Sequence, residues 1–304
     1  MAVISTHVTE RGIVGTMTER FQATPTYYQD LSTELKSQAA SEEYAILGQT
    51  PRMREWGTGR LAKGLGSEKY SIKNYEYECT LEIDRKELED DQVGLLSLRI
   101  SEAAAHAATH PDWLLAQLLI NGATAGYLSY DGVTFFNDTH VSGASGNQDN
   151  TLTFDATDHT TITVAEFKLA CAQAIQQMMG FKDDTGETMR IGPTGMNVIV
   201  PAALYWTALE ALNATMIAQT SNILAGAAKV IPLPDLTAAA VFYLLKTDVR
   251  IRPFIFQNRL PVEFQALLDG SPDWFTKNKG YAGCRGRYRL TYGYWQYAIR
   301  MEFT

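Results

Sequence analysis

Cysteine is scarce in this sequence, and its spacing matches none of the usual structural uses. The 304 residues include only Cys79, Cys171 and Cys284. No two of them form the CxxC pair of zinc sites and redox motifs, and an odd number of widely separated cysteines does not encode a disulfide framework. We therefore expect three reduced thiols and no structural metal.

Long apolar runs are also missing. A membrane-spanning helix needs about 20 consecutive, mostly apolar residues, and no stretch of this chain approaches that length. The N-terminus, MAVISTHVTERG, lacks the basic and then apolar layout of a signal peptide. We expect a soluble protein that is made in the cytosol and has no membrane partner.

Positive charge is in deficit. Lys and Arg total 26 against 34 Asp and Glu, which gives a formal net charge of -8. Such a chain has no global positive field to hold nucleic acid, so any contact with DNA would have to be local. The hydrophobic content of 45% is nevertheless enough for the core of one large or two ordinary domains.

Catalytic and cofactor motifs are absent as well. The glycine-rich run GTGRLAKGLG (57–66) lacks the GxxxxGK[ST] order of a phosphate-binding loop, and no GxSxG nucleophile elbow occurs. Asp138 and His140 have no third ligand nearby, which favours a turn-capping cluster. His106 and His110 have the i,i+4 spacing of a zinc pair without the HExxH order. We predict no catalytic residue, no cofactor and no metal.

The chain does contain helical and strand patterns without a regular βαβ alternation, which predicts an α+β protein. Residues 1–48 are polar and weakly patterned, as in an arm that lies on another surface, with a short helix expected from Tyr27 to Ala40. A capping box at Thr163 and Glu166 predicts a helix that ends at Gly180. Further expected elements are strands at 197–200, 240–245, 250–256 and 281–303, and a helix opened by Pro201.

Residues 75–83 alternate between apolar and polar side chains and predict a strand. Tyr70 and Ile72 have the opposite phase, so a bulge or face switch is expected near Asn74. The turn at 63–66 would close a hairpin with arms of roughly 15 residues, about 50 Å long. An isolated ribbon of that length is marginal, so it implies another surface to lie on.

A long helix is expected next, from Lys86 to about Thr109, with its acidic residues in the first turns, where the helix dipole favours them. Pro111 either kinks this helix or begins a second one that ends near Gly122.

A basic block precedes the predicted strand, and an acidic block begins within it and continues past its end. Between Arg52 and Lys73 six cations stand against two anions, and between Glu76 and Asp91 eight anions stand against two cations. The two blocks are either solvated faces or a contact in which one subunit's basic ribbon crosses the next subunit's acidic helix start. The residues assigned to such a contact are Arg54, Arg60, Lys63, Glu87, Asp90 and Asp91.

The C-terminal segment interleaves cations with tyrosines. This pattern occurs in single-stranded nucleic-acid binding, but it favours a subunit interface, where Arg and Tyr are both enriched. The cations concerned are Lys277, Lys279, Arg285, Arg287, Arg289 and Arg300.

Several segments resemble a known family, and they extend from about Phe21 to Ala298. They read EEYAILGQTPRMREWGTGRLAKGL, YSIKNYEYECTLEIDRKELEDDQVGLL, HAATHPD, YDGVTFFNDTH, RPFIFQNR and GYWQYA. Together these runs are similar to the major head subunit of Mu-like phages and prophages. The most specific part is MREW followed by GxR and by a strand that ends in EIDRKELEDD.

This resemblance implies the HK97-like capsid fold and a structural role. Copies would self-assemble as hexamers and pentamers into an icosahedral head around packaged DNA, in the bacterial host cytoplasm, with portal, scaffold and decoration proteins as partners. The alternatives are an enzyme such as a hydrolase, or a nucleic-acid-binding module. The implied division is an N-terminal arm at 1–48, an extended hairpin loop at 49–85, a peripheral domain with a spine helix at 86–160, an axial domain at 161–262, and returning C-terminal strands at 263–304.

Overall fold

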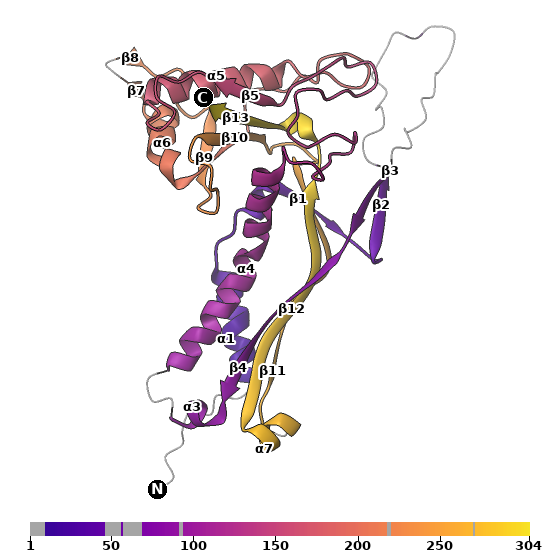
Figure 1. The fold of residues 1–304 in the computed structure, drawn as a ribbon, viewed down its shortest axis with the longest axis vertical. Coiled ribbons are helices and arrows are strands. Elements are labelled where there is room, and N and C mark those ends of the chain that lie inside the picture. Colours follow the sequence, from indigo (N-terminus) through magenta and orange to yellow (C-terminus); the bar gives the residue numbers. More distant parts are fainter. Residues whose placement is uncertain (1–9, 46–55, 57–68, 91–93, 218–219, 270) are drawn as a thin grey trace.

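The computed structural model describes residues 10–45, 56, 69–90, 94–217, 220–269 and 271–304. Within them the chain forms a compact head at one end and a long stalk at the other, as Figure 1 shows. The head holds the C-terminus, and the long helix α4 (Leu95–Asn121) runs up the stalk into it. No helix in these ranges is long and apolar enough to cross a membrane.

The stalk is built on a four-stranded sheet in the order β1-β11-β12-β4. β1 pairs with β11 in parallel, and the other two pairs are antiparallel. At about 3.3 Å per residue, the 14-residue strands β11 and β12 each span about 46 Å. The strands are β1 (Ser32–Lys36), β4 (Tyr75–Asp84), β11 (Phe254–Leu267) and β12 (Lys279–Tyr292).

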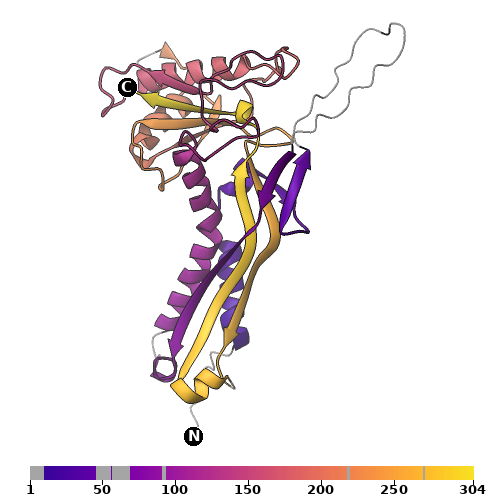
Figure 2. The ribbon, with the colours of Figure 1, turned by 45° about the vertical axis from the view of Figure 1, so that its right-hand side comes forward.

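Helices cover one face of this sheet, as the turned view in Figure 2 makes clear. Ile13 and Met17 of α1 (Glu10–Ala23) pack with Ile100 of α4 and Ile83 of β4 in a core of their own. Short helices cap the far end of the stalk: α3 (Arg85–Asp90) and α7 (Pro272–Lys277).

The head contains a second sheet, in the order β5-β13-β10-β6-β9, and the larger hydrophobic core. Its strands are β5 (Thr151–Phe154), β6 (Met196–Val200), β9 (Ala228–Pro232), β10 (Val241–Lys246) and β13 (Ala298–Phe303). Every residue of β6 and β10 is buried, which explains why these strands are mostly apolar runs and do not alternate between apolar and polar residues. The head helices are α5 (Val164–Met179), η1 (Ala202–Leu204), α6 (Tyr205–Asn213) and η2 (Trp295–Tyr297), and a short ladder joins β7 (Met216–Ile217) to β8 (Thr220–Ser221).

Several expectations are confirmed. The Thr163 hydroxyl accepts a hydrogen bond from the Glu166 backbone N–H, the Glu166 carboxylate accepts one from the Thr163 N–H, and Gly180 caps the helix. The face switch occurs at Asn74, where the chain leaves β3 (Lys69–Lys73) and enters β4. The buried Asn74 amide holds this corner: it donates to Ser37 Oγ at 2.8 Å and accepts from Gln257 Nε2 at 2.8 Å.

The expected hairpin arm was assigned the wrong partner. β4 does not extend a free ribbon: it pairs along its whole length with β12, inside the stalk sheet. β3 pairs instead with β2 (Ser41–Ala45), with Ala45 opposite Lys69. The expected turn at 63–66 lies outside the described residues. The alternation in 75–83 predicted a strand correctly, but a pleated pattern does not specify the neighbouring strand.

The helix expected from Tyr27 to Ala40 is also wrong over most of its length. Only α2 (Tyr28–Leu31) is helical, and β1 follows at once, because ladder bonds to β11 satisfy its backbone. The stalk helix begins later than expected and continues through Pro111 to Asn121 as a single element. Buried residues on both sides of Pro111, including Ala108 and Leu115, offset the missing backbone bond.

Candidate functional site

The FFNDTH segment places His140 in a closed cluster in the head. His140 is fully buried, with Nδ1 2.6 Å from Asp131 Oδ2 and Nε2 3.2 Å from the Phe135 carbonyl oxygen. Its ring stacks on Trp295 with centroids 4.1 Å apart. The carboxylate partner of His140 is thus Asp131 and not the Asp138 that stands beside it in the sequence. A buried ring with all its polar atoms engaged holds a loop in place and leaves no room for a substrate.

His106 and His110 both lie on α4, and the ring of His110 is engaged by aromatic neighbours. His110 packs against Tyr77 and Trp113, and its Nδ1 lies 2.8 Å from the Tyr288 hydroxyl oxygen. Burial lowers the pKa of His110. Within the described residues no three His, Cys, Asp or Glu side chains are grouped closely enough to hold a metal ion.

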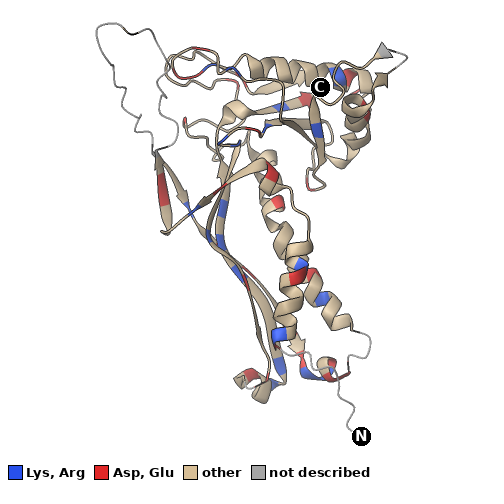
Figure 3. Ribbon diagram, turned by 180° about the vertical axis from the view of Figure 1, so that it is seen from behind, with Lys and Arg blue, Asp and Glu red and all other residues tan. Residues whose placement is uncertain are grey.

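The acidic block is divided by the fold. Glu76 and Glu82 on β4 form ion pairs with Arg285 and Lys279 of β12, so part of the block is already paired within the chain. Glu87 and Asp90 lie on α3, exposed, at the end of the stalk away from the head. Figure 3 shows the mixture of both charges along the stalk. Arg54, Arg60, Lys63 and Asp91 lie outside the described residues.

The C-terminal cations do not form a free basic strip. Besides the two pairs with β4, Lys277 lies 2.9 Å from Asp273, and Arg300 lies 2.8 Å from Glu302. Arg289 sits over the Tyr75 ring at 4.6 Å. These contacts engage five of the six cations that a nucleic-acid platform would offer to phosphates, all except Arg287.

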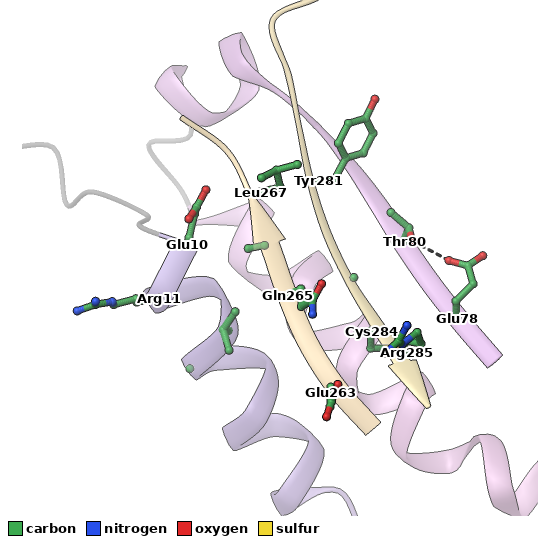
Figure 4. Close-up of a pocket in the computed structure, with 14 residues that line it drawn as sticks. Glu10, Arg11, Glu78, Thr80, Glu263, Gln265, Leu267, Tyr281, Cys284 and Arg285 are labelled. Atoms are coloured by element: carbon green, nitrogen blue, oxygen red, sulfur yellow. Dashed lines mark hydrogen bonds between the residues drawn. The ribbon is translucent and has the colours of Figure 1, made fainter. Parts of the chain in front are cut away.

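A groove of about 920 Å³ opens between α1 and the strands of the stalk sheet, as drawn in Figure 4. Glu10 and Arg11 of α1 lie along one wall, and Glu263, Glu78 and Arg285 come from three different strands. Gly283 also lines the groove, and a Cβ there would come within 2.8 Å of the Cys79 carbonyl oxygen, so the close strand packing favours glycine at this position. Burial raises the pKa of the lining Cys284 to about 11, so this thiol is a poor nucleophile at neutral pH. The groove offers charges of both signs and no nucleophile paired with a base.

Large apolar side chains are exposed at both ends of the molecule. Trp206 on α6 is 74% exposed and Phe275 on α7 is 89% exposed. Leu169 on α5 and Ile223 in the head are also mostly exposed. Large apolar side chains that a single chain leaves in water are candidates for contacts with another molecule. Leu169 and Trp206 both fall outside the buried stripe of their helices, so helical periodicity in the sequence could have indicated that they are exposed.

The long sheet with a helix running beside it, joined to a compact head, defines the HK97-like fold of phage capsid proteins. A procapsid chain of bacteriophage JBD30 has this fold: it is 23% identical, with a TM-score of 0.55, and the match covers 96% of this chain and 74% of that one. The capsid protein of cyanophage P-SCSP1u, 10% identical, has a TM-score of 0.61 over 92% of this chain and 89% of its own.

The chain belongs to the family described as the Mu-like prophage major head subunit gpT, which matches residues 8–166, 162–236 and 234–304. A relative is the Mu-like prophage FluMu major head subunit of Haemophilus influenzae, 33% identical over 161 residues. That alignment spans 51% of this chain and 51% of the relative, so about half of each is covered. The expected fold class and family are therefore confirmed.

Proposed function

We propose that this chain is the major capsid protein of a Mu-like phage or prophage head. Copies pack as hexamers and pentamers into an icosahedral shell that encloses the DNA genome, and the shell role itself requires no catalysis. The observation that carries the proposal is the exposure of Trp206 and Phe275 at opposite ends of an elongated chain. A monomer would leave both in water, whereas a closed shell gives each end a neighbouring copy to pack against.

The charge blocks fit a contact between copies better than a contact within one copy. Strands β2 and β3, which flank residues 46–68 in the sequence, lie toward the head, whereas α3 with Glu87 and Asp90 lies at the opposite end of the stalk. We assign Arg54, Arg60 and Lys63 of one copy to Glu87, Asp90 and Asp91 of the next. Each exposed pair contributes only about 0–1 kcal/mol, so the effect comes from repetition around the shell.

The proposal extends to partners and place. Portal and scaffold proteins would meet the shell during assembly in the bacterial host cytoplasm, and decoration proteins would add to its outside. DNA would lie inside by proximity, because the net charge of -8 offers no global field to bind it. Neither the enzyme nor the nucleic-acid-binding alternative gains a supporting observation from the described residues.

Particle formation by the purified full chain tests the proposal. Negative-stain microscopy and size-exclusion chromatography should show shells or capsomers under assembly conditions. Trp206→Glu should cut particle yield at least tenfold, while Trp206→Phe, which keeps an apolar ring, should assemble as the parent does. The two variants should unfold at the same temperature, since Trp206 is exposed in the single chain. A chain that stays monomeric at every concentration, or a Trp206→Glu variant that assembles normally, would contradict the proposal.

A further inference from the structure

Two of the three cysteines face each other across neighbouring strands. Cys79 on β4 and Cys284 on β12 are direct partners in the antiparallel ladder, although 205 positions separate them in the sequence. Directly opposed residues in such a ladder have Cα atoms about 4.5–5.5 Å apart and point to the same face of the sheet. A disulfide requires Cα atoms about 4.4–6.8 Å apart. The register therefore already meets the distance requirement of a cross-link.

The two thiols lie close enough to influence each other, and both are accessible from solvent. Burial, followed by the nearby Cys79 thiol, raises the pKa of Cys284 to about 11. Both side chains are half-buried, so a small molecule can reach them from solvent. The third cysteine, Cys171, is not accessible from solvent: it is fully buried in the head core, and burial raises its pKa to about 12.

We propose that Cys79 and Cys284 form a redox-dependent disulfide that fastens β4 to β12. Each thiol loses one proton and one electron, the S–S bond forms between the two sulfur atoms, and a small-molecule disulfide takes up the electrons and is cleaved to two thiols. A reducing cytosol keeps the pair open, and oxidising surroundings close it. The inference concerns the single chain and does not rest on the proposed shell role.

The location gives the cross-link a mechanical effect. Among the described residues, β4 is an edge strand of the stalk sheet, paired along one side with β12. Next to the cysteines, Ala282 of β12 opposes Leu81 of β4, and Ile83 is buried in the stalk core. A covalent bond at Cys79 and Cys284 would stop the edge strand from separating and would keep this core closed. Because the bond would span a loop of most of the chain, it also restricts the unfolded state strongly.

The test incubates the purified full chain, folded, with excess oxidised glutathione at mildly alkaline pH, where more of the Cys284 thiol ionises. Peptide mapping should identify one new bond, between Cys79 and Cys284, and alkylation after unfolding should label only Cys171. The oxidised chain should unfold about 5 °C higher than the reduced chain. Dithiothreitol should restore three free thiols and the original unfolding temperature.

The third cysteine supplies the control. Cys79→Ser and Cys284→Ser should each lose the oxidation-dependent shift, whereas Cys171→Ser should keep it. If Cys171→Ser fails to fold, the peptide map of the unmutated chain still decides the question. The proposal is overturned if the oxidised folded chain keeps three free thiols, carries glutathione that never resolves to an internal bond, or forms bonds that involve Cys171 or a second chain.

Discussion

Nδ1 of His140 lies 2.6 Å from Oδ2 of Asp131, with the imidazole ring stacked on Trp295. The same ring faces the Phe135 carbonyl oxygen with its other nitrogen, and the Asn150 amide donates to that oxygen at 2.8 Å. A single buried histidine therefore joins the turn at Asp131, the Phe135 segment and the 3-10 helix at Trp295. This contact fixes the FFNDTH loop against the head.

Removing His140 should destabilise the head. His140→Ala leaves a cavity beside Trp295 and strips the Asp131 carboxylate of its buried partner, so the free energy of unfolding should fall by about 3 kcal/mol. The matched control is Asp138→Asn, an exposed position in the same loop, which should stay within about 0.5 kcal/mol. Urea unfolding of the full chain, followed by tryptophan fluorescence, measures both. Equal stability of the two variants would show that the cluster is dispensable.

Asp112 should anchor the N-terminal segment to the stalk helix. Its carboxylate accepts hydrogen bonds from the backbone N–H of Tyr27 at 3.0 and 3.1 Å and from that of Tyr28 at 2.7 Å. Asp112→Ala should expose residues 24–36 to protease and cost about 1–3 kcal/mol. Asp112→Asn keeps one acceptor oxygen and should protect this segment nearly as well as Asp112.

Asp112 should also make the free energy of unfolding depend on pH. Burial raises the pKa of Asp112 above its ordinary value of 3.8, and the bonds from Tyr27 and Tyr28 only partly oppose this. The folded state thus holds this proton more tightly than the unfolded state does. Protonation of Asp112 therefore stabilises the fold fully below the ordinary pKa, and this stabilisation is lost as the pH rises through the raised pKa. Asp112→Asn should remove this pH dependence, which urea unfolding at a series of pH values measures. If the variant and the parent show the same pH dependence of the free energy of unfolding, Asp112 is not its source.

The capping box at the start of α5 should show the opposite dependence. The Thr163 hydroxyl, followed by the N–H groups of Thr157 and Thr163, lowers the pKa of Glu166 from 4.5 to about 2. A lowered carboxyl pKa stabilises the fold fully above about 4.5, and the gain disappears as the pH falls toward 2. The urea midpoint of the parent should therefore exceed that of Glu166→Gln at neutral pH, and the gap should narrow below pH 4.5. A gap independent of pH would mean that the carboxylate charge plays no part.

If the two charge blocks pair between copies, charge reversal in one block should impair assembly, and the matching reversal in the other block should restore it. Arg60→Glu with Lys63→Glu would place like charges opposite Glu87, Asp90 and Asp91 of a neighbour. Particle yield should fall while the unfolding temperature of the single chain stays unchanged. Adding Asp90→Lys and Asp91→Lys should restore assembly. Parent assembly should also weaken between 0.1 M and 1 M salt, as the Debye length falls from about 10 Å to about 3 Å. Normal particle yield from the Arg60→Glu, Lys63→Glu variant would identify the two charge blocks as solvated faces.

Local signals in the sequence were sufficient for several elements. The Thr163 and Glu166 pair predicted both the start of α5 and its capping hydrogen bonds, and Gly180 predicted its end. The alternation from Tyr75 to Ile83 predicted a strand, and the change of phase at Asn74 predicted the corner before it. Each of these features is determined by residues within a few positions of one another, so a short window of sequence contains the whole cause.

The tertiary structure alone decided which segments meet. Nothing near β4 in the sequence specifies β12 as its partner, and so nothing there specifies that Cys79 opposes Cys284 or that Glu76 meets Arg285. The continuation of α4 through Pro111, the extended state of Ser32–Lys36 and the pairing of His140 with Asp131 have the same origin. In each case the deciding free energy comes from buried surface and ladder bonds supplied by residues far away in the chain, and local propensity is too weak to oppose it.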